Sequence, residues 1–440
     1  MDYKELYTEK LISIPEAVSK VESNQKVCTA MAGSEPQGLL SELGNHKDEL
    51  ENVNIVSCLM MGDYDFLKPE MKGHFLNETW FYGPGDRANH KHGNVTYIPN
   101  NLHEAGSIKI DNDNINIFWG TATSMDKNGF FSLSLGLTYE KQMVENIDMV
   151  VLEVNENLPW TLGDTQVHIS DVDYVVENNA PLIELPYIEP GDVEKKIGEN
   201  VAELIEDGST LQLGIGGIPN AVANALMGKK DLGIHTEMMT TGMMKLAKAG
   251  VITGKNKNLY PNKIVCTFAL GTKELYDFMN DNPSIVIKDG HWVNDPYIIG
   301  LNDNQISINT TIEIDLTGQC ASESLGTVQY SGTGGQADTA IGAQRSKNGK
   351  SFIALYSTTS VYNKEKDQRE TISKIVPILK PGAAVTLSRN DVDYVVTEYG
   401  VAKLRGTNLK ERVNRLINIA HPNFRDELRQ KAIEMNYIQR

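Results

Sequence analysis

One carboxylate in this chain lies where a folded protein could use it for chemistry. Glu237 follows a short apolar run, Leu232 to Thr236, and precedes a segment with helical periodicity over residues 241–249. Open α/β sheets bind their ligands beyond the carboxyl ends of the strands, so Glu237 is in a suitable position for catalysis. Taken alone, a glutamate in such a loop is more simply interpreted as a solvated surface residue.

Two glycine-rich turns in the second half of the chain are candidates for anion binding. The first comprises Gly214, Ile215, Gly216, Gly217 and Ile218, and the second includes Gly332, Gly334, Gly335 and Gln336. Such turns expose backbone N–H groups, which suit a phosphate, a carboxylate or an oxyanion. Pro219 occupies the place of the third glycine in the dinucleotide-binding pattern, and no Walker lysine is present. Tight turns without a ligand remain the alternative, more so for the first than for the second.

Other catalytic arrangements find less support in the sequence. His90, His92 and His103 have no carboxylate at metal-ligand spacing, so we expect no metal site. The G-x-S-x-G pattern of serine hydrolases is absent, and none of the four cysteines lies in a nucleophile signature. Covalent chemistry in this chain would therefore use a carboxylate.

An internal repeat predicts the architecture that positions these residues. Residues 14–36 align without a gap to residues 197–219, and the sequence DVDYVV at 171–176 recurs at 391–396. Both segments alternate apolar strands with amphipathic helices, as expected for α/β units. The fold class predicted is α/β, with two tandem homologous lobes and mainly parallel sheets. We place the lobes at residues 1–188 and 189–440, with the second enlarged by about 40 residues in its loops.

Local patterns give the expected elements. We predict strands at 54–57, 149–154, 210–214, 263–268 and 352–355, a helix at 194–206, and two C-terminal helices within 408–436. Pro422 separates the two C-terminal helices, because the residue before a proline is disfavoured in the α region.

Composition excludes several classes of protein. The chain has 440 residues and a formal net charge of −17, which disfavours nucleic acid and anionic membranes as partners. Cysteines are few and lack C-x-x-C spacing, and no apolar stretch is long enough to span a bilayer. We therefore expect a soluble, cytoplasmic protein.

Four motifs together resemble the acetyl-CoA hydrolase/transferase family, in particular its 4-hydroxybutyrate CoA-transferase subgroup. They are LQLGIGGIPNAV from Leu211, LGIHTEMMTTGMMKL from Leu232, YSGTGGQAD from Tyr330 and SRNDVDYVVTEYGVAKLRG from Ser388. The resemblance implies that Glu237 is the nucleophile, that the turn from Gly214 to Ile218 binds coenzyme A, and that the turn from Gly332 to Gln336 lines the same site. Thr339, Gly217 and Lys403 depart from the family pattern, which bears on the acyl preference.

The implied reaction is ping-pong transfer of CoA between a short acyl-CoA (butyryl, 4-hydroxybutyryl, propionyl or acetyl) and a carboxylate such as acetate. A glutamate with an ordinary pKa near ~4.3 is ionised at pH 7, so Glu237 needs no partner base. Acyl-CoA enters as substrate with no tightly bound cofactor, and the family suggests a homodimer or larger homo-oligomer. Candidate cations for the CoA phosphates are Lys374, Arg389 and Arg405, and residues 33–36 are predicted to form the opposite wall of the site.

Three alternatives stay open from the sequence. An acyl-CoA hydrolase would use the same residues, with water discharging the intermediate. A non-catalytic module could bind CoA or sugar phosphates through the glycine turns. A sugar-phosphate isomerase or deaminase on a similar fold would form no covalent CoA adduct. Residues 74–103 and 291–299, where aromatic and asparagine residues gather, are expected to shape the acyl pocket.

Overall fold

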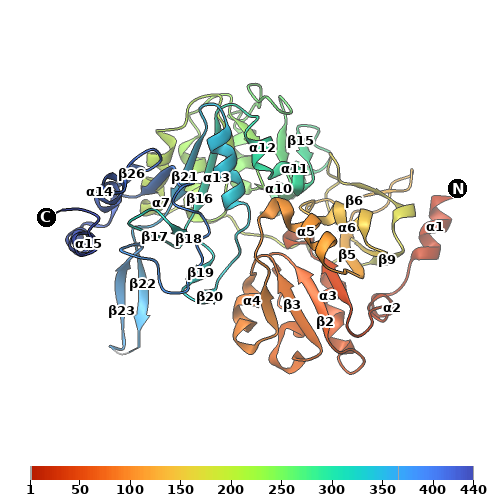
Figure 1. Cartoon of the computed structure of the whole chain (residues 1–440). Coiled ribbons are helices and arrows are strands. Elements are labelled where there is room, and N and C mark those ends of the chain that lie inside the picture. Colours follow the sequence, from red (N-terminus) through yellow and green to blue (C-terminus); the bar gives the residue numbers. More distant parts are fainter. Residues whose placement is uncertain (1, 365, 440) are drawn as a thin grey trace.

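Two lobes, each built on one large sheet, make up the protein. The structure is a computed structural model that describes residues 2–364 and 366–439. In Figure 1 the N-terminal lobe (red to yellow) and the C-terminal lobe (green to blue) lie side by side, with the chain ends far apart. We use N-terminal lobe for the chain through Glu177 and C-terminal lobe for the chain from Asp192 onward.

The N-terminal lobe contains a seven-stranded sheet in the order β4-β3-β2-β1-β5-β7-β9. Every neighbouring pair in it is parallel. The strands are β1 (Lys26–Thr29), β2 (Val53–Ser57), β3 (Phe75–Thr79), β4 (Val95–Tyr97), β5 (Ile117–Ala122), β7 (Met149–Val154) and β9 (Tyr174–Glu177).

The C-terminal lobe contains an eight-stranded sheet in the order β15-β13-β11-β10-β16-β21-β25-β26. Its pairs are parallel except for β25 with the edge strand β26, which are antiparallel. The strands are β10 (Thr210–Leu213), β11 (Gly233–His235), β13 (Ile264–Cys266), β15 (Ile285–Ile287), β16 (Gln305–Thr310), β21 (Lys350–Ala354), β25 (Tyr394–Thr397) and β26 (Gly400–Lys403).

Both sheets follow the same order through their first seven strands, as the repeat predicts. The repeated segments supply β1 and β10 at the centre of each sheet, and the two DVDYVV sequences supply β9 and β25. The predicted α/β class with two mainly parallel sheets is therefore confirmed.

Helices connect the strands. The N-terminal lobe has α1 (Tyr3–Lys10), α2 (Ile14–Val18), α3 (Gln37–Leu43), α4 (Pro84–Asn89), α5 (Ala105–Asn112) and α6 (Glu140–Asn146). The C-terminal lobe has α7 (Asp192–Ala202), α8 (Gly217–Ala225), α9 (Thr241–Lys248), α10 (Lys273–Met279), α11 (Gly290–Val293), α12 (Pro296–Ile299), α13 (Gln336–Arg345), α14 (Leu409–Ile419) and α15 (Pro422–Glu434). As predicted, the last two helices are separate, and Pro422 opens α15 in its first turn, where its missing N–H costs nothing.

Short strands in the loops form small additional sheets of two or three strands. They are β12 (Met238–Met239) with β14 (Phe268–Ala269), β6 (Phe130–Ser132) with β8 (Gln166–His168), β17 (Glu313–Asp315) with β18 (Cys320–Ala321) and β24 (Ile375–Val376), β19 (Ser324–Leu325) with β20 (Val328–Gln329), and β22 (Thr358–Asn363) with β23 (Gln368–Ser373). The hairpin β22–β23 projects from the C-terminal lobe in Figure 1.

Side chains on the two faces of each sheet belong to different cores. In β21, Phe352 and Ala354 pack in one cluster and Ile353 in another, which is the alternation of a sheet buried on both faces. One cluster contains residues of the N-terminal lobe alone, and a second contains residues of the C-terminal lobe alone. The third and largest contains residues of both lobes, so the lobes share a core.

Backbone hydrogen bonds also join the lobes. Gly136 forms an antiparallel bridge with Phe268, and Gly163 forms a parallel bridge with Ile287. Between them, the Leu137 N–H donates to the Thr267 carbonyl at 2.9 Å. The N-terminal lobe thus adds strand-like segments to the C-terminal lobe close to Glu237.

One predicted strand, at 263–268, is broken in the structure into β13 and β14. The break falls at Thr267, whose N–H donates to the Glu237 carbonyl at 2.9 Å instead of continuing the sheet. Within the described residues, no helix is long and apolar enough to cross a membrane.

Candidate active site

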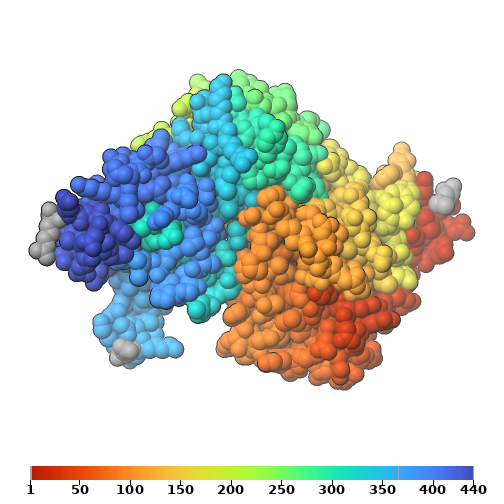
Figure 2. Space-filling view, viewed as in Figure 1, coloured from red at the N-terminus to blue at the C-terminus, as the bar shows by residue number. Residues whose placement is uncertain are grey.

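A cavity of about 860 Å³ lies between the two lobes at the carboxyl ends of the C-terminal strands. Figure 2 shows a hollow between the hairpin β22–β23 and the N-terminal lobe. Both predicted glycine turns and Glu237 line the cavity; the lining residues named in advance are Gly214, Ile215, Gly216, Gly217, Ile218, Glu237, Gly332, Gly334, Gly335 and Gln336. Three segments that are distant in sequence therefore share one site.

Glu237 lies in the short connection between β11 and β12. Its carbonyl accepts hydrogen bonds from the N–H groups of Thr267 (2.9 Å) and Phe268 (3.2 Å), which fix the backbone beneath the side chain. The following helix, α9, begins at Thr241, and the Thr240 hydroxyl caps it by accepting from the Met243 N–H. Both ends of this segment are anchored, so the carboxylate has a defined direction into the cavity.

Two donors hold the Glu237 carboxylate. The Asn294 side chain donates from Nδ2 to Oε2 at 2.9 Å, and the Gly335 N–H also hydrogen-bonds to the carboxylate. Burial raises the pKa of Glu237 to about 7, with a further rise from the charge of Asp338, while the two hydrogen bonds oppose the shift. The expectation of an ordinary glutamate pKa is wrong for this residue, because the carboxylate is desolvated between the lobes.

The glycines of the second turn are required by close packing. A Cβ atom on Gly335 would lie 1.9 Å from Oε2 of Glu237, and one on Gly332 would lie 2.1 Å from the Trp80 carbonyl oxygen. No side chain fits at either position without displacing the carboxylate or the N-terminal lobe. The turn is thus packed tightly between Glu237 and the N-terminal lobe.

Gln336, the last residue of that turn, uses both its amide nitrogen and its amide oxygen in hydrogen bonds within the protein. Its Nε2 donates to the Thr310 carbonyl at 2.7 Å, and its Oε1 accepts from the Ser322 hydroxyl at 2.7 Å. These bonds fix the start of α13 and leave Gln336 to shape the wall of the cavity.

The first glycine turn leads into α8. Gly216 has a φ of +108°, a region that favours glycine, and it precedes the first residue of the helix. The Gly214 N–H donates a hydrogen bond to the Ile308 carbonyl at 3.1 Å. The N–H groups of a first helical turn have no intrahelical acceptor, so the turn presents donors and the positive end of α8 to the cavity.

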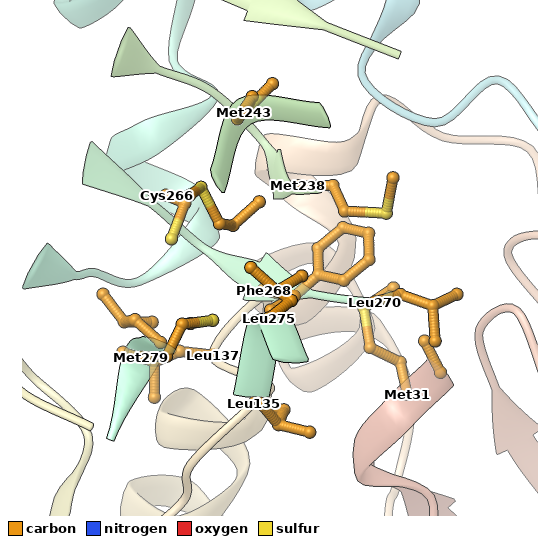
Figure 3. Close-up of a cluster of buried hydrophobic side chains, with 14 of the residues drawn as sticks. Met31, Leu135, Leu137, Met238, Met243, Cys266, Phe268, Leu270, Leu275 and Met279 are labelled. Atoms are coloured by element: carbon orange, nitrogen blue, oxygen red, sulfur yellow. The ribbon is translucent and has the colours of Figure 1, made fainter. Parts of the chain in front are cut away.

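The cavity wall near Glu237 is largely apolar. Met31 of the N-terminal lobe and Met238, Phe268 and Leu270 of the C-terminal lobe line it. Figure 3 shows these four side chains grouped closely together. Cys58 also lines the cavity, and burial followed by the charge of Glu237 raises the pKa of its thiol well above the ordinary range.

Of the three predicted phosphate-binding cations, one lies at the cavity. Lys374 lines it together with Lys380, whereas Arg389 and Arg405 do not. Arg389 precedes the parallel strand β25, and Arg405 follows the antiparallel strand β26, so both lie at the amino edge of the sheet. Their assignment to the CoA phosphates is therefore wrong on topological grounds.

The predicted opposite wall, residues 33–36, also needs correction. Met31 lines the cavity, but Gly33, Ser34, Glu35 and Pro36 do not. Glu35 is buried and accepts from the N–H groups of Met61 (2.7 Å) and Gly62 (2.8 Å) and from the Tyr64 hydroxyl (2.6 Å). This carboxylate shapes the loop that bears Met61, which does line the cavity.

Several residues at the site were not singled out by the sequence. Asn294 lies within the segment 291–299 expected to shape the acyl pocket, but its bond to Glu237 has no sequence signature. His103 was considered as a metal ligand and lies at the end of the segment 74–103 expected to shape the acyl pocket. In the structure its ring nitrogen Nδ1 lies 2.8 Å from Oδ1 of Asp338. Only the three-dimensional meeting of separate loops reveals these contacts.

Fold and site together define an enzyme with two α/β lobes and a half-buried carboxylate that faces glycine-rich turns. A family model described as the acetyl-CoA hydrolase/transferase N-terminal domain matches residues 1–185, and one described as the C-terminal domain of the same family matches residues 271–432. The chain belongs to the acetyl-CoA hydrolase/transferase family.

Individual relatives agree with this family and with a CoA-transferase class of enzyme. The 4-hydroxybutyrate coenzyme A transferase of Clostridium kluyveri is 46% identical and covers 97% of this chain and 98% of its own. The succinyl-CoA:cyclohexane-1-carboxylate CoA transferase of Geobacter metallireducens is 43% identical, covering 99% and 98%. The crystal structure of RipA from Yersinia pestis superimposes with a TM-score of 0.92 at 36% identity, covering 100% of both chains.

Proposed function

We propose that this enzyme transfers CoA between a short-chain acyl-CoA and a carboxylate, with Glu237 as the covalent nucleophile. The observation that carries the proposal is the carboxylate itself, which lines an interlobe cavity and is held by Asn294 and the Gly335 N–H. A carboxylate nucleophile needs no partner base once it is ionised. Its position between the lobes also limits the access of water to reactive intermediates.

The reaction balances without water or an oxidant. An oxygen of Glu237 attacks the thioester carbonyl carbon, the C–S bond breaks, and CoA leaves as a thiolate, so that the acyl group remains bound to Glu237 as a mixed anhydride. The thiolate then attacks the Glu237 carbonyl carbon, the anhydride C–O bond breaks, and the first acid departs as a carboxylate. A second carboxylate attacks the resulting glutamyl-CoA thioester, and the same steps run in reverse to give the new acyl-CoA.

Each tetrahedral intermediate carries an oxyanion that needs hydrogen-bond donors. The two glycine turns line the same cavity as Glu237, and the Gly335 N–H already contacts its carboxylate. Fixed donors of this kind stabilise charge that develops in the transition state. The turn from Gly332 to Gln336 is thus assigned to the oxyanion, and the turn from Gly214 to Ile218 to coenzyme A.

The wall around Glu237 favours a small apolar acyl group. Met31, Met238, Phe268 and Leu270 offer no charge to a second carboxylate on the acyl chain. Flexible methionine side chains adapt to chains of somewhat different length. Linear acyl groups such as butyryl, 4-hydroxybutyryl, propionyl or acetyl are therefore the proposed donors, with acetate among the acceptors.

Lys374 and Lys380 are the proposed partners of the CoA phosphates, because both are cations that line the cavity. Burial lowers the pKa of Lys374 to about 8, so a bound phosphate would favour its charged form. Lys374→Ala should raise the KM for butyryl-CoA about tenfold while kcat changes little. Turnover of butyryl-N-acetylcysteamine, which lacks the phosphates, should be unaffected, and Arg389→Ala is the matched control. An equal loss with both thioesters would refute the phosphate assignment.

The covalent step is tested by trapping. The protein is incubated with butyryl-CoA and reduced with borohydride, and intact and peptide masses are measured. Reduction of a glutamyl-CoA thioester to an alcohol lowers the mass of the residue by about 14 Da, and we expect this change at Glu237. It should vanish in Glu237→Gln and persist in Glu313→Gln, a matched change at another cavity carboxylate. Acyl-CoA consumption that needs no acceptor acid would instead identify a hydrolase.

A further inference from the structure

The two donors that hold Glu237 come from separate segments of the C-terminal lobe. Asn294 immediately follows the one-turn helix α11, and Gly335 immediately precedes α13. Neither segment is braced only by its own lobe, because both contact the N-terminal lobe at the same residue. That residue is His103, in a short 3-10 turn at Leu102–Glu104.

On the α13 side, His103 bonds to Asp338. Its ring Nδ1 lies 2.8 Å from Oδ1 of Asp338, and its backbone N–H donates to Oδ2 at 3.2 Å. The Asp338 side chain is only 2% exposed, so the histidine supplies bonds that water does not. Asp338 lies in the first turn of α13, three residues after Gly335.

On the α11 side, the same residue accepts a hydrogen bond. Nδ1 of His291 donates to the His103 carbonyl at 2.8 Å. His291 and Asn294 belong to one turn, since the Asn294 N–H donates to the Gly290 carbonyl at 2.9 Å. A shift of His291 would therefore move Asn294 relative to Glu237.

We propose that His103 is a positioning residue for the reaction, which fixes both segments that carry the hydrogen-bond donors of Glu237. The inference rests on the proposed role of Glu237 as nucleophile. It links the contact between the lobes to catalysis: through His103 the N-terminal lobe, which supplies no nucleophile, helps to set the geometry of the nucleophile in its neighbour.

Electrostatics agree with this geometry. Burial alone would lower the pKa of His103, but the hydrogen bond and the charge of Asp338, aided by Glu104 and Asp295, raise it overall. The ring therefore opposes the negative charge of Asp338, which otherwise acts on Glu237. The backbone bridges of Gly136 with Phe268 and of Gly163 with Ile287 do not involve the donors of Glu237 and can hold the lobes together without His103.

The test measures how fast the Glu237–CoA thioester forms, by rapid mixing with butyryl-CoA and borohydride trapping. His103→Ala removes the ring and keeps the backbone contacts to Asp338 and His291. We expect thioester formation and kcat to fall about 10- to 100-fold, with KM within about threefold of wild type, since misplacement of reacting groups costs rate. His103→Asn should recover most of the rate, because its amide offers an N–H near the position of Nδ1.

Two further variants separate positioning from folding. His168→Ala removes a ring hydrogen-bonded to the Ser170 hydroxyl in the same lobe and should leave the rate unchanged. His291→Ala should lower kcat without raising KM, by less than His103→Ala does. Equal losses in His103→Ala and His103→Asn, or wild-type rates in both His103→Ala and His291→Ala, would overturn the inference alone. Absence of any adduct at Glu237 in the wild-type protein would overturn the proposed function and this inference with it.

Discussion

The carboxyl edges of the two sheets have the same topology and opposite character. In the N-terminal lobe Cys28 pairs with Val56, and in the C-terminal lobe the repeat-equivalent Leu211 pairs with Ile234. Leu59 lies three residues after Val56, and Glu237 lies three residues after Ile234. One lobe thus presents an apolar residue to the cavity at the position where the other presents a carboxylate.

The turns after the first strands differ in the same way. In the C-terminal lobe, Ile215 is 42% exposed and its turn opens onto the cavity. In the N-terminal lobe, the equivalent turn is buried, and the Glu35 carboxylate accepts a hydrogen bond from the N–H of Met61 in a neighbouring loop. The comparison shows that the fold offers the same position for a catalytic residue in both lobes. Among the residues that the structure describes, an open turn and a carboxylate that faces the cavity occur only in the C-terminal lobe.

Replacing the cavity carboxylate should have the largest effect. Glu237→Gln cannot form the anhydride or the thioester, so CoA transfer should fall at least a thousandfold, as an order-of-magnitude estimate for loss of a nucleophile. The measurement is acyl exchange between butyryl-CoA and acetate. Undiminished turnover would show that Glu237 is not the nucleophile, and the C-terminal lobe would then no longer differ from the N-terminal lobe by a catalytic carboxylate.

Adding a methyl group beside the carboxylate should come next. Gly335→Ala would bring Cβ to 1.9 Å from Glu237 and 2.3 Å from Nδ2 of Asn294, forcing both to move. We expect kcat to fall about 100-fold with the fold retained, as measured by steady-state kinetics and circular dichroism. Gly228→Ala, where a Cβ meets nothing within 4 Å, is the control. A normal kcat in Gly335→Ala would show that this contact does not position Glu237.

The acidity of Glu237 predicts a pH profile. Burial raises its pKa to about 7, and only the ionised form attacks, so kcat/KM should fall about tenfold for each pH unit below 7 and level off above it. Asn294→Ala removes a hydrogen bond that favours ionisation, so its inflection should move to higher pH. If kcat/KM does not change from pH 5 to 8, the rate does not depend on the ionisation of Glu237.

The smallest effect on catalysis should come from the carboxylate of the other lobe. Glu35→Gln replaces an acceptor of three hydrogen bonds by an amide that must turn a donor toward N–H groups. We expect the free energy of unfolding to fall by about 1–3 kcal/mol and kcat per folded molecule to change only a few-fold. Urea denaturation and active-site titration measure the two quantities. A loss of transfer comparable to that of Glu237→Gln would give Glu35 a chemical role.

Sequence reasoning found the fold because it follows from local patterns: repeated strand-turn-helix segments predicted two similar sheets. The two glycine turns were candidates from their composition, and the resemblance to the family implied that they share one site with Glu237. The lobe boundary at 188/189, the covalent role of Glu237, the homo-oligomer and the cytoplasmic location stay predictions.

What the sequence missed depends on contacts between distant loops. The partnership of Asn294 with Glu237, and of His103 with Asp338, joins residues from loops without any shared motif. The raised pKa of Glu237 arises from burial between lobes, which a free glutamate does not experience. Arg389 and Arg405 were misplaced because proximity in sequence to a repeat landmark does not say at which edge of the sheet a residue lies.

The core shared by the two lobes has a consequence for how the protein unfolds and how it can evolve. Because one hydrophobic cluster contains residues of both sheets and backbone bridges join them, neither half can lose its structure without exposing the interior of the other. Calorimetry should therefore show a single cooperative transition rather than two. A duplication that has merged its interiors in this way cannot discard the copy that lacks the nucleophile.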